Sequence, residues 1–113
     1  MQFHRKLIIP ESVTDIGDYA FYFCSSLTGI NIPDGVTGIG RAVFTGCKSL
    51  AEIDIPYGIT SIGDYAFSGC SSLENITYEG SMEKWGMIVK NTGWNDDTGD
   101  YTVHCTDGTI TEV

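Results

Sequence analysis

Residues 10–32 read PESVTDIGDYAFYFCSSLTGINI, and this stretch recurs twice more along the chain at a step of 23 residues. Residues 33–55 read PDGVTGIGRAVFTGCKSLAEIDI, and residues 56–78 read PYGITSIGDYAFSGCSSLENITY. A proline opens each copy, and an Ile-Gly pair, a phenylalanine, a cysteine and a leucine follow at matching positions. We call the copies the first, second and third units. A fixed period of this kind is typical of repeat architectures, in which each copy is one supersecondary unit.

The end of each unit predicts a β-strand. Ile30 and Ile32 are two residues apart, so both side chains point to the same face of a strand. The proline that opens the next unit has no N–H and therefore ends the strand. The apolar spacing over residues 13–21 is mixed and predicts an irregular or short helical return. Since no single unit can enclose its apolar residues, we expect the units to stack so that each column packs on its own kind.

Stacking in register predicts a parallel sheet in which each column contributes one residue per rung. Leu7, Ile8 and Ile9 match the end of an earlier unit that is otherwise missing. We expect that the chain is cut from a longer array. The alternatives are shielding of this edge by residues 1–6, or a homodimer that pairs through Leu7, Ile8 and Ile9.

The repeat stops at Glu79, and residues 79–113 carry a different pattern. Ser81 is a good N-cap for a helix over MEKWGMIV, in which Trp85, Ile88 and Val89 form one apolar stripe. Residues 101–106 alternate like a strand, and Asp107-Gly108 predicts a hairpin turn into a second strand. We expect this segment to form a C-terminal cap that covers the last unit and its strand edge.

The repeat LxxIxIPxxVTxIGxxAFxxCxS resembles that of the BspA-like leucine-rich repeat proteins over residues 7–78. The resemblance implies an α/β solenoid: a short, right-handed leucine-rich repeat coil with parallel strands on the concave face, closed by a C-terminal helix and β-hairpin. One domain would then span residues 1–113, with 23-residue repeats over 7–78 and the cap over 79–113. Val43 departs slightly from the pattern, since it stands where Ala20 and Ala66 stand.

Members of that family are mostly surface-exposed or secreted proteins of host-associated anaerobic bacteria and some protists. They are regarded as adhesion or ligand-binding proteins rather than enzymes. The resemblance therefore implies a cell-surface or secreted location, although residues 1–9 do not read as a signal peptide.

The chain is strongly acidic, with 15 Asp and Glu against 6 Lys and Arg in 113 residues, for a net charge of -9. Such a surface repels phosphate backbones, so we expect no nucleic-acid binding. We also expect no membrane insertion, because the sequence contains no apolar run of the roughly 20 residues that a span needs.

The cysteine, histidine and acidic residues do not show the spacing of a catalytic or metal-binding site. Cys24, Cys47 and Cys70 recur with the repeat and predict a column of buried free thiols, and Cys105, far along the chain, is a candidate for a fourth buried thiol. Neither zinc spacing nor disulfide geometry fits this column. His4 and His104 form no predicted dyad with a cysteine, and residues 95–100 do not match a calcium loop. We therefore predict no catalytic residue, no metal site and no cofactor.

Binding candidates come from positions that the stacking turns outward. Two strand columns face solvent, and they contain Lys6, Gly29, Glu52 and Asn75 in one and Ile8, Asn31, Asp54 and Thr77 in the other. Glu52 and Asp54 are the best polar pair. Three tyrosines near the predicted corners are candidate anchors, because tyrosine is favoured at interfaces. The predicted binding residues are Glu52, Asp54, Asn31, Asn75, Thr77, Tyr19, Tyr22 and Tyr65.

These features favour a non-catalytic module that binds a protein or glycan partner, in adhesion or host interaction. The alternative is a structural spacer within a longer surface protein. The third and least favoured hypothesis is an enzyme, because no column supplies paired carboxylates in a pocket.

Overall fold

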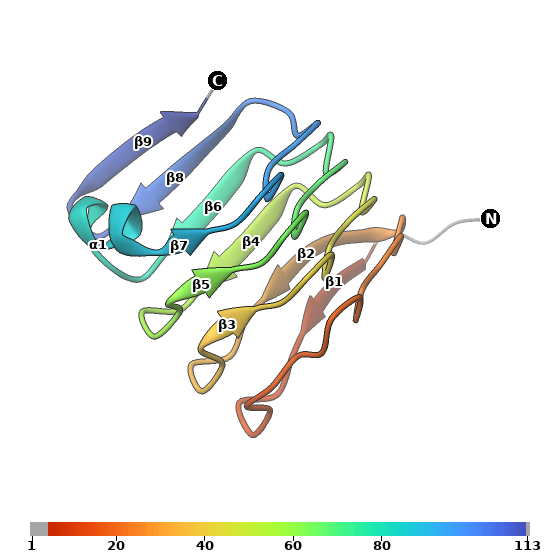
Figure 1. The fold of residues 1–113 in the computed structure, drawn as a ribbon, viewed down its shortest axis with the longest axis horizontal. Helices are drawn as coiled ribbons and strands as arrows, with labels where there is room; N and C mark the ends of the chain where they lie inside the picture. The colour runs from red at the N-terminus through yellow and green to blue at the C-terminus, as the bar shows by residue number, and fades with distance from the viewer. Residues whose placement is uncertain (1–4, 113) are drawn as a thin grey trace.

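The computed structural model describes residues 5–112 of the chain. The molecule measures 42 × 34 × 23 Å and is a stack of coils (Figure 1). Its elements, in chain order, are β1 (Arg5–Ile8), β2 (Leu27–Asn31), β3 (Gly38–Ile39), β4 (Glu52–Ile55), β5 (Ser61–Ile62), β6 (Asn75–Tyr78), α1 (Met82–Met87), β7 (Val89–Lys90), β8 (Tyr101–Cys105) and β9 (Gly108–Glu112).

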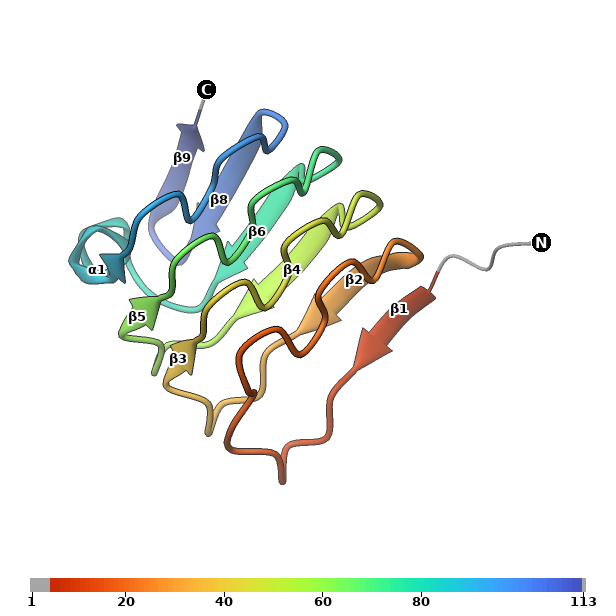
Figure 2. The same ribbon diagram turned by 45° about the vertical axis from the view of Figure 1, so that its right-hand side comes forward.

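Two sheets form the walls of the coils. The larger has the order β1-β2-β4-β6-β8-β9, in which all pairs are parallel except the antiparallel pair β8-β9. The smaller contains β3, β5 and β7 in parallel. The turns after β1, β2 and β4 line one side of the molecule, and the return corners line the opposite side (Figure 2). The predicted parallel solenoid is confirmed.

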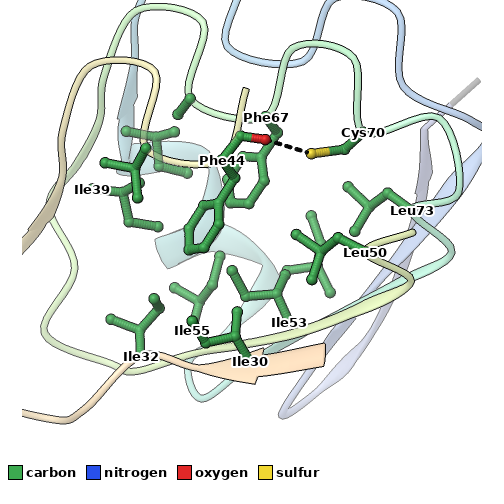
Figure 3. Packing of buried hydrophobic residues seen from close by; sticks show 14 of the residues in the cluster. Ile30, Ile32, Ile39, Phe44, Leu50, Ile53, Ile55, Phe67, Cys70 and Leu73 are labelled. Atoms are coloured by element: carbon green, nitrogen blue, oxygen red, sulfur yellow. Dashed lines mark hydrogen bonds between the residues drawn. The ribbon is translucent and has the colours of Figure 1, made fainter. Parts of the chain in front are cut away.

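The core consists of the repeat columns packed on their own kind. Ile30, Ile53 and Ile76 are paired across neighbouring strands, and each is at most 2 % exposed. The rings of Phe44 and Phe67 stack with centroids 5.2 Å apart (Figure 3). Val43 is fully buried, so the units absorb its larger side chain. Stacking like on like therefore buries each column without a second layer of secondary structure.

The return path of each of the first three units contains turns and no helix, and in the second and third units it also contains the short strands β3 and β5. Backbone N–H groups of one unit donate to carbonyls of the next, as in Phe21 N to Val43 O (2.9 Å) and Phe44 N to Ala66 O (2.8 Å). Bonds between units satisfy the backbone here, so no helix is needed.

Residues 79–105 follow the path of a further coil. Phe67 N donates to Trp94 O (2.8 Å), and Ile76 pairs with Val103. Trp94 follows Phe67 by 27 residues rather than 23, and α1 occupies the added length. The predicted cap segment thus contains a helix and a hairpin, and its strands β7 and β8 also extend the two parallel sheets by one coil.

Helix α1 is held at its start by two side chains. Ser81 Oγ accepts a hydrogen bond from Lys84 N (3.0 Å), and Asp107 Oδ1 accepts one from Met82 N (2.8 Å). Trp85 and Ile88 are buried as predicted, whereas Val89 is 59 % exposed and begins β7. The predicted stripe was wrong at Val89, because the helix ends at Met87 and the chain becomes extended. None of the helices in residues 5–112 has the length and apolar character to cross a membrane.

Candidate binding site

The outward positions of the six-stranded sheet form two continuous columns. Pairing aligns Lys6, Gly29, Glu52, Asn75 and Thr102 in one, and Ile8, Asn31, Asp54, Thr77 and His104 in the other. We call these ten residues the polar sheet face. The register confirms both predicted columns and extends each by one residue of β8.

The five predicted residues on this face differ in what their side chains do. Asn31 fastens the strand before the first unit: its Oδ1 accepts from Ile9 N (2.8 Å) and its Nδ2 donates to Ile9 O (3.3 Å). Asn75 Oδ1 lies 2.8 Å from His104 Nε2, which holds these two side chains together. Glu52, Asp54 and Thr77 are exposed and are therefore the members most accessible to a partner.

The polar sheet face leads into a hollow of about 660 Å³ at the carboxyl ends of β2 and β4. Asn31 and Asp54 line it from the sheet. Its other polar or aromatic lining residues are Glu11, Asp34, Tyr57 and Glu79. We call this the acidic hollow. Its volume lies within the range of ligand pockets, and its four carboxylates exclude an anionic ligand.

Sequence reasoning missed four residues of the acidic hollow, although a signal for three of them was present. Glu11, Asp34 and Tyr57 occupy one repeat column, directly after the proline that ends each strand. Glu79 stands where the next proline would be. The position after a strand's carboxyl end is thus variable in this repeat, and it borders the sheet face.

Tyr19 and Tyr22 lie together at the corner of the first unit. Their ring centroids are 5.4 Å apart with planes at 78°, and Phe23 adds a third ring 4.5 Å from Tyr22 at 88°. We call Tyr19, Tyr22 and Phe23 the aromatic corner. Tyr65 does not join it, because Tyr65 lies two units away in the column that contains Tyr19 and Ala42.

Phe23 is the residue of the aromatic corner that sequence reasoning missed. Its backbone φ is 56°, and Gly46 and Gly69 take the matching positions of the next two units with φ of 76° and 77°. Left-handed backbone favours glycine, since other side chains are strained there. The sequence did contain a signal for Phe23, because the second and third units have glycine at the matching position.

The cysteine prediction was right for two of three units. Cys47 and Cys70 are buried, but Cys24 is exposed, because no coil covers the outer side of the first unit within residues 5–112. Cys105 was predicted as a further buried thiol and is only half-buried. Burial raises the pKa of Cys47 to about 11 and that of Cys70 to about 12, so both thiols stay protonated and unreactive at neutral pH.

The remaining chemical candidates are dispersed. His104 lies on the polar sheet face, while its neighbour Cys105 packs against the core. Within residues 5–112, no three His, Cys, Asp or Glu side chains gather in a way that could hold a metal ion. His4 lies outside the described residues.

Comparisons with known proteins agree on the family. A family model described as a BspA type leucine-rich repeat region of six copies matches residues 3–89. A search of the curated proteins found no significant match.

Two solved structures are similar to the chain. One is a leucine-rich repeat protein from Bacteroides ovatus, 36 % identical, with a TM-score of 0.65 over 88 % of this chain and 24 % of that one. The other is a leucine-rich cell surface protein from Faecalibacterium prausnitzii, also 36 % identical with a TM-score of 0.65, over 76 % of this chain and 29 % of that one. The chain thus spans about a quarter of the length of these proteins. From its 23-residue ladder and from these matches, the chain belongs to the BspA-type leucine-rich repeat family.

Proposed function

We propose that the chain is a non-catalytic binding module of a bacterial cell-surface or secreted protein, with a role in adhesion or host interaction. The observation that carries this proposal is the acidic hollow, in which Asn31 and Asp54 of the polar sheet face meet the carboxylates of Glu11, Asp34 and Glu79. The partner would be a protein or a glycan. The similar protein from Faecalibacterium prausnitzii is a cell surface protein, which supports the location.

The polar sheet face suits binding because its side chains are mounted on a fixed ladder. Each of its strands between β1 and β8 is paired on both sides, so a partner would order little backbone on binding. Within the columns, Glu52 lies between Gly29 and Asn75, and Asp54 lies between Asn31 and Thr77. Separating the carboxylates by neutral residues avoids the cost of like charges placed opposite each other.

The alternative role is a structural spacer. The regular ladder favours it, as does the fact that the chain covers only 24 % and 29 % of the two similar structures. A spacer needs only the stacked columns and tolerates any polar residue on its outer faces. The two roles therefore differ in whether the exposed carboxylates matter.

The test is a binding screen of the purified chain against a printed glycan array and a panel of host matrix and plasma proteins. Glu52→Gln and Asp54→Asn remove the two central charges and keep the side-chain shapes. Glu74→Gln is the matched control, since Glu74 is exposed but belongs neither to the polar sheet face nor to the acidic hollow. If the chain is a binding module, Glu52→Gln and Asp54→Asn should each lower its affinity for the partner at least tenfold, and Glu74→Gln should not. A chain that binds nothing in either panel supports the spacer.

A further inference from the structure

We propose that the aromatic corner anchors an arginine-bearing segment of a partner protein. The inference rests on the proposed binding role but concerns a different surface. The acidic hollow lies where strands of the larger sheet end, whereas the aromatic corner lies on the opposite side, where the return path turns back toward that sheet (Figures 1 and 2).

The three rings of the aromatic corner are exposed and add little to the core. Tyr19 is 51 % exposed, Tyr22 is 48 % exposed and Phe23 is 58 % exposed. The core of this unit uses Phe21, which stacks on Phe44 with centroids 5.6 Å apart. Neighbouring rings in the corner meet edge to face, so each contact covers at most one face of a ring.

The backbone under these rings is strained and held in place. Tyr19 has a φ of 63° and Phe23 has a φ of 56°, both in the left-handed region. Tyr19 N donates to Arg41 O (2.9 Å) and Phe23 N donates to Thr45 O (2.8 Å), so the second unit fixes this conformation. Ala42 and Tyr65 take the same left-handed conformation at the matching position of the next two units, so the repeat itself sets this backbone. The backbone that carries the rings is therefore ordered before a partner binds, which lowers the entropic cost of binding.

The charge around the aromatic corner selects a cation. The first unit contains no Lys, Arg or His, and its exposed residue Asp18 directly precedes Tyr19. Asp18 Oδ1 accepts a hydrogen bond from Arg41 N (2.9 Å), which holds this carboxylate beside the corner. An arginine guanidinium is planar, stacks on aromatic faces and pairs with carboxylates, so it matches both features. The chain itself makes contacts of this class, with Lys84 Nζ 4.2 Å from the ring centroid of Tyr57.

The test measures fluorescence anisotropy of three labelled octapeptides with the full chain. One alternates arginine with glycine, the second has lysine, and the third has citrulline, which keeps the shape of arginine without its charge. The proposal expects the arginine peptide to bind at least tenfold more tightly than either of the others. Equal binding of the lysine peptide would show general attraction to the acidic chain and would overturn the proposal.

Variants locate the binding on the surface. Phe23→Gly and Tyr19→Gly remove rings at positions whose backbone suits glycine, and each should weaken the arginine peptide at least tenfold. Tyr65→Gly is the matched control, because Tyr65 is exposed and has a φ of 57° but lies outside the corner. An equal loss in Tyr65→Gly would contradict the assignment. Glu52→Gln and Asp54→Asn should leave this binding unchanged, so the result is separate from that for the acidic hollow.

Discussion

The thiol of Cys70 donates a hydrogen bond to the carbonyl oxygen of Phe44, 3.1 Å away in the preceding unit (Figure 3). Cys47 makes the same bond to Phe21 O at 3.1 Å. The cysteine column therefore ties each unit to the phenylalanine column of the unit before it. This role is structural, and it explains why the repeat has a cysteine at this position without a metal or a disulfide.

The buried thiols predict a loss of stability at alkaline pH. In the unfolded chain these thiols lose their protons near pH 9.0, whereas burial keeps Cys47 protonated to about pH 11 and Cys70 to about pH 12. Above pH 9 the folded state thus binds more protons than the unfolded state, and the free energy of unfolding falls as pH rises through this window. Urea unfolding at about pH 8 and about pH 10 measures the difference.

The control for this prediction is Cys47→Ala combined with Cys70→Ala. This variant is less stable at every pH because it leaves cavities, but its stability should fall less steeply above pH 9 than that of the native chain. Equal slopes in the two proteins would show that other groups cause the alkaline loss.

Removing one buried hydroxyl should stabilise the protein. Tyr78 Oη is buried and has no hydrogen-bond partner among residues 5–112, while its ring packs against Trp85 at 5.4 Å. Tyr78→Phe should raise the free energy of unfolding by about 1 kcal/mol, because an unpaired buried oxygen is costly. Tyr101→Phe is the control, since Tyr101 Oη accepts from Asn95 Nδ2 (3.0 Å) and its loss should cost about 1 kcal/mol. A destabilised Tyr78→Phe would indicate a partner for that hydroxyl.

The two kinds of phenylalanine should respond differently to truncation. Phe23→Gly loses a ring contact and gains backbone freedom in the unfolded chain, but it relieves left-handed strain, so stability should stay within about 1 kcal/mol of the native value. Phe44→Ala empties a fully buried position and should cost about 3–5 kcal/mol. Thermal unfolding of both variants checks this contrast. A loss of similar size in both would place Phe23 in the fold rather than on a binding surface.

We propose that the edge of β1, which has no strand on its outer side among residues 5–112, pairs with a second copy of the chain. Leu7 is 39 % exposed, although Ile30 and Ile53 in its column are at most 2 % exposed. A hollow of about 380 Å³ beside Leu7 is lined by Phe21 and Leu27. Light scattering should give twice the mass of 12.3 kDa, and Leu7→Asp should restore the monomer. Thr77→Asp, on the exposed sheet face, should leave the dimer intact, and a monomeric native chain would refute the pairing.

The stacked columns could be predicted from sequence because a fixed period determines the register. Once Ile30, Ile53 and Ile76 share a column, the outward positions between them follow, and Glu52 and Asp54 are placed correctly. The further coil over residues 79–105 could not be predicted in this way, because α1 changes the spacing and Trp94 replaces phenylalanine.

The aromatic corner shows what the period cannot reveal. Its shape depends on left-handed backbone at Tyr19 and Phe23, and hydrogen bonds to the second unit hold that backbone in place. Side-chain periodicity carries no signal for such bonds. Tyr19 and Tyr22 were therefore identified as exposed, but their grouping with Phe23 needed the structure.

A pair of alanine substitutions tests the stacking of units most directly. A Cβ at Gly63 would lie 2.6 Å from the carbonyl carbon of Gly40 and 2.9 Å from Arg41 N, whereas a Cβ at Gly17, in the same repeat column, would have nothing within 4 Å. Chemical denaturation should therefore show that Gly63→Ala loses about 2–3 kcal/mol, while Gly17→Ala changes stability by less than about 0.5 kcal/mol. Equal effects of the two substitutions would contradict the close contact between successive coils on which the fold and both proposed binding surfaces depend.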